Sequence, residues 1–114
     1  MDEYINEKQL TKILKATSDV TRRSLLTSLV QEGPLRVTEL AAQYDMSLNA
    51  ISKHIKVLES AKLVSRTTLG RVHLIKAELA PIQQIDNWFK SLRSIWDLRL
   101  DNLEHILKKE FNDE

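Results

Sequence analysis

Residues 38–60 read TELAAQYDMSLNAISKHIKVLES and carry the pattern of two helices joined by a tight turn. Thr38 is a suitable N-cap for a short first helix, which continues through Leu40 to Tyr44. Ser47 is expected to cap a second helix over about residues 47–61, because its apolar residues recur at helical spacings of four and three. These apolar residues are Ile51, Ile55 and Leu58.

The segment that follows changes its period from helical to alternating. Leu63–Thr68 and Arg71–Ile75 are rich in β-forming residues and flank Gly70, which is free to adopt a positive φ. A β-hairpin over about residues 63–76 is therefore expected directly after the second helix. Two helices, a tight turn and a hairpin in this order are typical of a winged helix-turn-helix domain, in which the second helix is the recognition helix and the hairpin is the wing.

Further helical patterns lie on both sides of this unit. Upstream, Leu10, Ile13 and Leu14 indicate a first helix, Ser18-Asp19 caps a second, and Gly33-Pro34 ends it. Downstream, Pro81 opens a helix to about residue 111 whose apolar residues keep a near-heptad spacing that Arg99 interrupts. The apolar residues of this last helix are Ile82, Ile85, Phe89, Leu92, Trp96, Leu103 and Ile106.

The expected fold is thus mainly α, with about five helices and a two-stranded β-hairpin wing in a single domain over residues 1–114. At 42% hydrophobic residues, the chain can form a real core. It has no cysteine, which excludes disulfides and thiolate metal sites. Met1–Tyr4 does not resemble a secretory signal, and no stretch approaches the roughly 20 apolar residues that cross a bilayer. We therefore expect a cytoplasmic protein without a membrane partner.

The charge distribution points to nucleic acid more clearly than the net charge of +1 does. Residues 36–76 contain seven basic and three acidic residues, whereas residues 77–114 contain five basic and eight acidic ones. A basic centre between less basic ends is what a DNA-binding segment carried by non-binding helices would show.

The outer face of the recognition helix carries side chains suited to reading DNA. Asn pairs bidentately with adenine, Ser bonds several bases, Leu touches the thymine methyl group, and Lys reaches guanine or phosphate. A polar outer face is also what any solvated helix shows. The interpretation of this face as a DNA-binding surface therefore depends on the neighbouring turn and wing. The predicted DNA contacts of the recognition helix are Ser47, Leu48, Asn49, Ser52, Lys53, His54 and Lys56.

The wing adds Arg66, Thr68 and Arg71 around the hairpin tip as predicted DNA contacts. A basic wing can straddle phosphates or enter the minor groove. The alternative is an edge hairpin that charge protects from aggregation. The hairpin directly follows the recognition helix, which favours the interpretation as a DNA-binding wing over that as a protected edge.

Three stretches of the chain resemble the ArsR family of transcriptional regulators. Residues 16–23, ATSDVTRR, are similar to the family signature ALSDPTRR, and residues 47–58 resemble its recognition helix. Leu63-Val64 with Gly70-Arg71 is similar to the family's wing. The chain departs from the pattern at Val20, where proline is usual, and at Asp45 and Lys62, where glycine is common.

The resemblance implies a homodimer, formed by the first and last helices, on an imperfect palindrome whose half-sites lie about 34 Å apart. The breadth of apolar surface on the last helix supports self-association independently, although such a helix could also only seal its own core. The predicted dimer-interface residues are Leu10, Ile13, Leu14, Phe89, Leu92, Trp96, Leu103 and Ile106.

The signal that would control such a regulator is less defined by the sequence. Some family members bind metal through cysteines of the short helix that precedes the recognition helix. This metal site has no counterpart here, because the corresponding residues are Glu39 to Ala42. On the last helix, His105 with Asp101 or Glu104 is an open but weak metal candidate, and we assign no metal or cofactor. A small-molecule effector near Trp88 and Trp96, or a partner protein, remains open.

The sequence therefore predicts a sequence-specific double-stranded DNA-binding transcription regulator, a repressor acting as a homodimer. The alternative is a winged-helix module that binds a protein partner and no DNA. An enzyme is not expected, because no Ser/His/acid set or glycine-rich phosphate loop stands out. The three histidines, His54, His73 and His105, fall on three separate elements.

Overall fold

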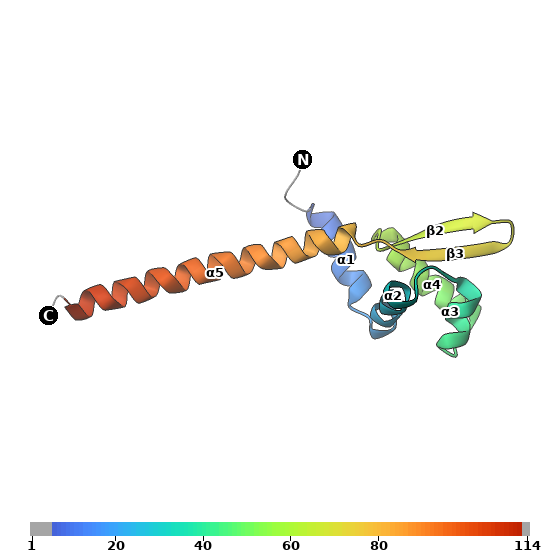
Figure 1. Cartoon of the computed structure of the whole chain (residues 1–114), viewed down its shortest axis with the longest axis horizontal. Helices are drawn as coiled ribbons and strands as arrows, with labels where there is room; N and C mark the ends of the chain where they lie inside the picture. The colour runs from blue at the N-terminus through green and yellow to red at the C-terminus, as the bar shows by residue number, and fades with distance from the viewer. Residues whose placement is uncertain (1–5, 113–114) are drawn as a thin grey trace.

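The computed structural model describes residues 6–112, which form five helices and a small three-stranded sheet (Figure 1). The predicted mainly helical winged helix-turn-helix fold is confirmed. Met1–Ile5, including the residues judged for a secretory signal, lie outside the described residues. The elements in chain order are α1 (Glu7–Thr17), α2 (Val20–Glu32), β1 (Leu35–Arg36), α3 (Val37–Gln43), α4 (Leu48–Ser60), β2 (Val64–Leu69), β3 (Val72–Ala77) and α5 (Ala80–Asn112).

Side-chain caps start three of the helices. The Asn6 side chain accepts hydrogen bonds at the start of α1, and Asp19 accepts one from the Arg22 N–H at the start of α2. Ser47 accepts from the Ala50 N–H and begins α4, as the sequence predicts. Each bond satisfies a backbone N–H that lacks a partner in the first turn.

The start of α3 corrects one expectation. Arg36, not Thr38, occupies the N-cap position, and α3 begins at Val37. The Arg36 N–H donates to the Glu39 carboxylate at 3.2 Å, which fixes the helix start directly at the end of β1.

The core lies where α1 to α4 meet the inner face of the sheet. The predicted inward residues of α4, Ile51, Ile55 and Leu58, are completely buried there. They pack with apolar side chains from the other elements, and no polar residue among those described is buried. The largest other fully buried side chains are Ile13, Leu25, Leu29, Leu40, Leu63 and Ile75.

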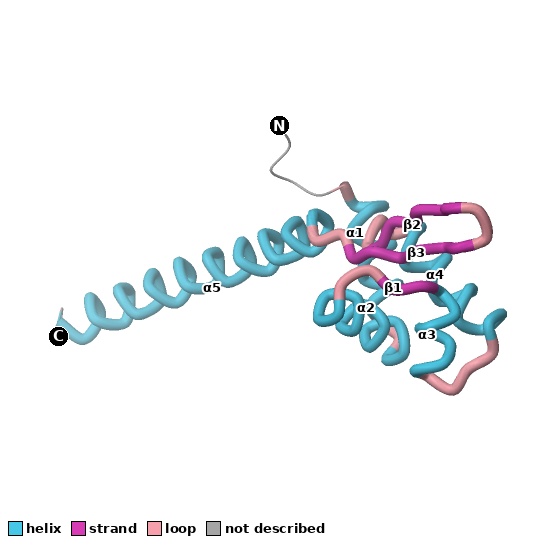
Figure 2. Tube along the Cα trace, turned by 45° about the vertical axis from the view of Figure 1, so that its right-hand side comes forward, coloured by secondary structure: helices cyan, strands magenta, loops and turns pink. Residues whose placement is uncertain are grey.

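The sheet has one strand more than predicted. Its order is β1-β3-β2, with both pairs antiparallel, and Leu35 lies opposite Ile75 (Figure 2). The sequence suggested only an extended link at Leu35–Arg36. Gly33, at φ 85, ends α2 and allows the chain to turn so that this link lies beside β3.

Among residues 6–112, two residues other than glycine adopt a left-handed backbone. Asp45, in the turn between α3 and α4, has φ 49, and Lys62, after α4, has φ 61. These are the two positions at which the ArsR family commonly has glycine. Left-handed geometry costs a non-glycine residue on the order of 1 kcal/mol, with Asp better tolerated.

Helices α1 to α4 and the sheet form the head of the molecule. Helix α5 starts at this head and extends away from it for most of its length (Figure 1). Pro81 is buried, and Ile82 and Ile85 pack against the core. Every described residue from Phe89 onward is exposed. Because α5 projects in this way, the molecule is elongated and measures 77 × 33 × 22 Å. No helix among residues 6–112 is long and apolar enough to span a bilayer.

Candidate nucleic-acid interface

Helix α4 presents its polar face to solvent. Of the seven predicted contacts on this helix and its cap, Ser47, Leu48, Asn49, Lys53 and Lys56 are exposed, while Ser52 and His54 are half-buried. The completely buried Ile51, Ile55 and Leu58 hold the opposite face against the core. The N-terminal turn and the lysine-bearing face of α4 are therefore accessible to a large ligand.

A cleft of about 490 Å³ lies between α4 and the wing. It brings together four predicted contacts, namely Leu48 and Ser52 of α4 with Arg66 and Arg71 of the hairpin. Arg36, from β1, also lines it, so three arginines contribute to one hollow beside the exposed face of α4, although Arg66 pairs with Glu59 and Arg36 lies 3.8 Å from Glu39. Such a basic hollow can hold a phosphate group of nucleic acid. Its full lining is Arg36, Val37, Thr38, Leu48, Ser52, Arg66, Arg71, Val72 and His73.

Arg36 is not among the DNA contacts predicted from the sequence. The only signal available was its place among the basic residues of the middle segment. It reaches the cleft because β1 pairs with β3, which carries Arg36 opposite Leu74 on the wing strand.

The two wing arginines differ in their surroundings. The Arg66 Nη2 donates to Glu59 Oε1 at 2.8 Å, so Arg66 ties the wing to α4. Arg71 follows Gly70 at the hairpin tip and is exposed. Within residues 6–112 no carboxylate pairs with Arg71, so its guanidinium is available to a ligand. Thr68, the third predicted wing contact, is exposed and hydrogen-bonds the His73 Nδ1 at 3.1 Å.

His54 faces the head rather than open solvent. Its Nδ1 lies 3.5 Å from Arg22 Nη1 and 3.9 Å from Asp19 Oδ2. Arg22 also donates from Nε to the Ala16 carbonyl at 2.7 Å and from Nη2 to the Lys15 carbonyl at 3.0 Å. The ATSDVTRR segment therefore joins the end of α1 and the start of α2 to the recognition helix at His54. The DNA contact expected of the half-buried His54 stays a prediction.

The Asp19 carboxylate belongs to the same cluster. The hydrogen bond from the Arg22 backbone N–H is the main reason that the pKa of Asp19 lies below its ordinary value of 3.8. Some desolvation raises this pKa, whereas the positive charges of Arg22 and His54 lower it further. A carboxylate held charged at a helix N-terminus also interacts favourably with the helix dipole.

The predicted dimer residues divide into two groups. Leu10 and Ile13 are only 6% and 1% exposed, because the apolar face of α1 packs against α2 and α4. This corrects the expectation, since these two side chains leave almost no surface for a second copy. Leu14 and all five predicted residues of α5 are exposed. Those five are Phe89, Leu92, Trp96, Leu103 and Ile106.

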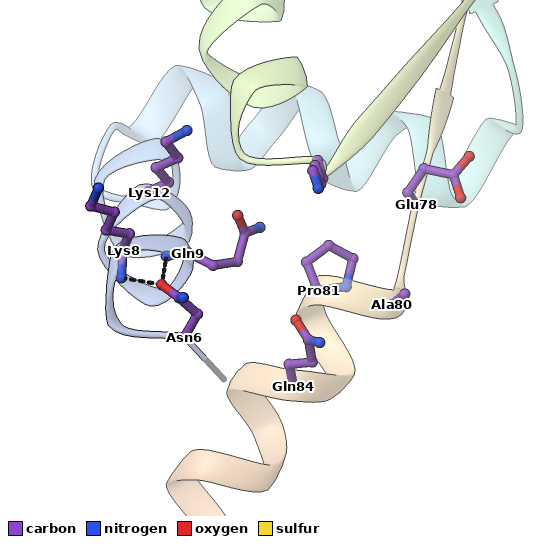
Figure 3. A pocket seen from close by; sticks show the side chains of 9 residues that line it. Asn6, Lys8, Gln9, Lys12, Glu78, Ala80, Pro81 and Gln84 are labelled. Carbon is purple, nitrogen blue, oxygen red and sulfur yellow. Dashed lines mark hydrogen bonds between the residues drawn. The ribbon is translucent and has the colours of Figure 1, made fainter. Parts of the chain in front are cut away.

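A second hollow, of about 620 Å³, lies where α1 meets the start of α5 (Figure 3). Gln9 and Pro81 face each other across it, and Asn6 caps α1 at its rim by accepting from the Lys8 and Gln9 N–H groups. Lys8, Lys12 and Lys62 are among its lining residues. It shares no lining residue with the cleft between α4 and the wing, so the two hollows are separate features.

The remaining expectations on effectors concern α5. Trp88 is half-buried and packs on Phe89, with ring centroids 4.9 Å apart, whereas Trp96 is exposed. Asp101, Glu104 and His105 lie exposed on this helix. In the part of the chain that the structure describes, no three or more His, Cys, Asp or Glu side chains gather as a metal site.

Comparison with known proteins agrees with this geometry. Residues 17–67 match the family described as a helix-turn-helix domain. The transcriptional repressor SdpR of Bacillus subtilis (strain 168) is 28% identical over 79 residues, covering 69% of this chain and 87% of that protein. The uncharacterized HTH-type transcriptional regulator YuzN of the same strain is 34% identical over 79 residues, covering 64% and 86%.

A solved structure extends the likeness beyond the helix-turn-helix segment. The crystal structure of an ArsR family transcriptional regulator, RHA00566, is similar with a TM-score of 0.77 and 33% identity, over 82% of this chain and 96% of that one. The fold, the α4–wing surface and these relatives agree. The chain therefore belongs to the ArsR family of winged helix-turn-helix, DNA-binding transcriptional regulators.

Proposed function

We propose that this regulator is a repressor that binds an imperfect palindrome as a homodimer. The observation that carries the proposal is the exposed, lysine-bearing face of α4 beside a cleft that three arginines line. A protein bound at this position over a promoter would exclude the polymerase. The relative SdpR, which is named a transcriptional repressor, supports this direction of regulation.

In the proposed complex, the N-terminal half of α4 lies in the major groove. Asn49 would pair with an adenine edge, Leu48 would touch a thymine methyl group, and Lys53 would reach guanine or phosphate. These three side chains are exposed on one end of the helix, whose unpaired N–H groups also favour phosphate. Base contacts would give specificity, and Lys56 would add a phosphate contact.

The wing would contact the adjacent backbone. Arg71 is placed at the hairpin tip to reach phosphate or the minor groove, while Arg66 stays tied to Glu59. Arg36 lies in the same cleft as both, which supports a phosphate position between α4 and β3. The predicted contacts thus divide into base-reading residues on α4 and phosphate-binding residues on the wing.

Dimerisation would use the exposed apolar side of α5 together with Leu14 of α1. A contiguous exposed apolar surface of this kind marks a site of interaction with another molecule. A two-fold dimer would relate the two α4 helices as the two halves of a palindrome are related, separated by one helical turn or a multiple of it.

The test is DNA binding by a two-site variant and a charge-matched control. Fluorescence anisotropy would follow the protein on a labelled duplex from its own promoter region. Lys53→Ala with Arg71→Ala should weaken binding by about 100-fold or more and reduce the slope of log affinity against log salt by about 4, because the homodimer loses two basic side chains in each subunit. Lys90→Ala with Lys108→Ala removes the same charge from α5 and should leave both values nearly unchanged.

Three results would contradict the proposal. Equal loss in both variants would indicate non-specific attraction rather than an α4–wing interface. Wild-type protein with no salt-dependent affinity for any duplex would favour the protein-binding alternative. Binding that activates transcription from the same promoter would overturn repression alone.

A further inference from the structure

The hollow between α1 and the start of α5 belongs to neither of the surfaces proposed above. None of its lining residues is among the predicted DNA contacts or the predicted dimer contacts. Its volume of about 620 Å³ lies in the range of small-molecule sites, which is about 300–1,000 Å³. Four segments of the chain meet around it, namely α1, the loop after α4, the link from β3 to α5 and the first turns of α5. The hollow is therefore a candidate ligand site in its own right.

The charges around this hollow are not balanced. Lys8 and Lys12 line it from α1, and Lys62 lines it from the loop after α4. Against these three positive charges stands one carboxylate, that of Glu78, so the lining carries a net charge of +2. In the part of the chain that the structure describes, no carboxylate forms an ion pair with any of the three lysines. The Glu78 carboxylate instead lies 3.7 Å from the Nζ atom of Lys76, so the hollow offers positive charge to an anionic ligand.

The backbone at Lys62 gives an independent indication of a site. Lys62 has φ 61, a left-handed geometry that glycine adopts without strain. Its N–H donates to the Glu59 carbonyl at 2.9 Å, which holds this turn directly after α4. A strained residue that is kept where glycine would serve is typical of functional positions. We interpret the lysine at this position as present for its ammonium group beside the hollow.

Uncharged polar groups complete the lining. Gln9 on α1 and Gln84 on α5 both point into the space between the two helices (Figure 3). The Gln9 Nε2 donates to the Ala61 carbonyl at 3.0 Å, which orients its amide so that the oxygen can accept a further bond. Gln84 is exposed, and its amide offers both a donor and an acceptor. Such groups suit a ligand that carries hydroxyl groups next to its charge.

We propose that this hollow binds a small phosphate monoester with a hydroxyl-bearing body, such as a sugar phosphate, and that the bound ester weakens DNA binding. A phosphate monoester carries a charge of about −1.5 to −2 at pH 7, which the net charge of the lining balances. Lysine binds phosphate as a point charge on a flexible stem, so the exposed Lys8 and Lys12 can close over an anion held beside Lys62. The two glutamine amides then bond the hydroxyl groups of the body.

The effect on DNA binding follows from what borders the hollow, and this part rests on the proposed function. Ala61 is the C-cap of α4, and its bond from Gln9 joins the recognition helix to α1. The Glu78 N–H donates to the Leu63 carbonyl at 2.8 Å and joins the same loop to the link before α5. An ester at Lys62 lies between these two bonds and cancels positive charge beside the end of the recognition helix. Less positive charge means weaker attraction to the DNA backbone.

An NMR titration of isotope-labelled protein tests the site. Glucose 6-phosphate and ribose 5-phosphate are the ester probes, glucose is the uncharged probe, and inorganic phosphate is the anion without a body. Both esters should shift the amide signals of Gln9, Lys62 and Gln84 and should bind more tightly than inorganic phosphate, whereas glucose should not bind. No shift with either ester at about 10 mM, which would nearly fill a site with a Kd of about 1 mM, would overturn the proposal. Equal affinity for inorganic phosphate would overturn the assignment to an ester.

Two variants and one control test whether the lysines hold the ligand. Lys8→Ala with Lys12→Ala, and separately Lys62→Gly, should each weaken ester binding about tenfold. Lys108→Ala with Lys109→Ala removes two positive charges from the far end of α5 and should leave ester affinity unchanged. All of these residues are exposed, so circular dichroism should show intact folding. Equal loss in the control, or no loss in the two hollow variants, would overturn the site.

DNA anisotropy at constant ionic strength then separates the effect on DNA from the site itself. A saturating ester should weaken wild-type binding to the promoter duplex by about threefold or more, and the Lys8→Ala, Lys12→Ala variant should not respond. Ester binding without any change in DNA affinity would overturn the effector role. Wild-type protein that binds no duplex even without ester would instead overturn the proposed function, while the NMR titration still decides the site.

Discussion

The Nδ1 atom of His54, on the recognition helix, lies 3.5 Å from the Nη1 atom of Arg22 on α2. Arg22 also holds the carbonyl groups of Lys15 and Ala16 at the end of α1. One side chain thus connects three helices, which gives a physical reason for the arginine in the ATSDVTRR segment.

Loss of Arg22 should therefore destabilise the head. Arg22→Met removes two hydrogen bonds from a charged donor to backbone carbonyls and leaves those carbonyls with fewer partners. We expect the free energy of unfolding to fall by about 1–3 kcal/mol, measured by urea denaturation. Arg23→Met is the matched control, because Arg23 makes one exposed bond, to the Thr17 carbonyl. Similar losses in both variants would contradict the assigned role of Arg22.

Asp19 should make stability depend on pH in acid. Its pKa is lower in the folded chain, chiefly because its carboxylate accepts from the Arg22 N–H. A lowered pKa contributes stability that is present above 3.8 and is lost as the pH falls through the folded value. Asp19→Asn keeps a good N-cap but cannot ionise. Thermal unfolding at pH 7 and pH 3 should show a smaller acid-induced fall in Tm for the variant, whereas an equal fall would contradict the assignment.

The backbone at Lys62 offers a stabilising substitution. Lys62 is exposed and has φ 61, so Lys62→Gly relieves left-handed strain without removing a buried contact. Because glycine also gains entropy in the unfolded chain, we expect a net gain of about 0.5 kcal/mol. Lys56→Gly, on the exposed face of α4, should instead lose about 1 kcal/mol. If Lys62→Gly were as destabilising as this control, the strain argument would be wrong.

Local signals in the sequence predicted much of this fold. Asp19 and Ser47 are caps whose partners lie three residues away, so their role could be recognised from sequence alone. The spacing of Ile51, Ile55 and Leu58 gave the buried face of α4 for the same reason. The family resemblance marked Asp45 as a place for left-handed backbone.

Contacts between residues that are distant in the sequence could not be predicted from local patterns. The strand β1 is two residues long, and its partner at Ile75 is distant in sequence, so only an extended link could be predicted. Periodicity showed that Leu10 and Ile13 share an apolar face but not which molecule covers it. The same limit applies to Arg66, whose charge suggested DNA while Glu59 holds it against α4.

The Glu59–Arg66 pair leads to a prediction that separates wing anchoring from DNA contact. The two side chains are 31% and 26% exposed and 2.8 Å apart, so solvent screens the pair only in part. A double-mutant cycle with Glu59→Ala and Arg66→Ala should give a coupling free energy of about 0.5–1 kcal/mol in urea unfolding. In anisotropy titrations Arg66→Ala should weaken DNA binding less than Arg71→Ala, because only Arg71 has its guanidinium available at the hairpin tip. The reverse order of DNA affinities, with no coupling in the cycle, would mean that Arg66 leaves Glu59 for the nucleic acid.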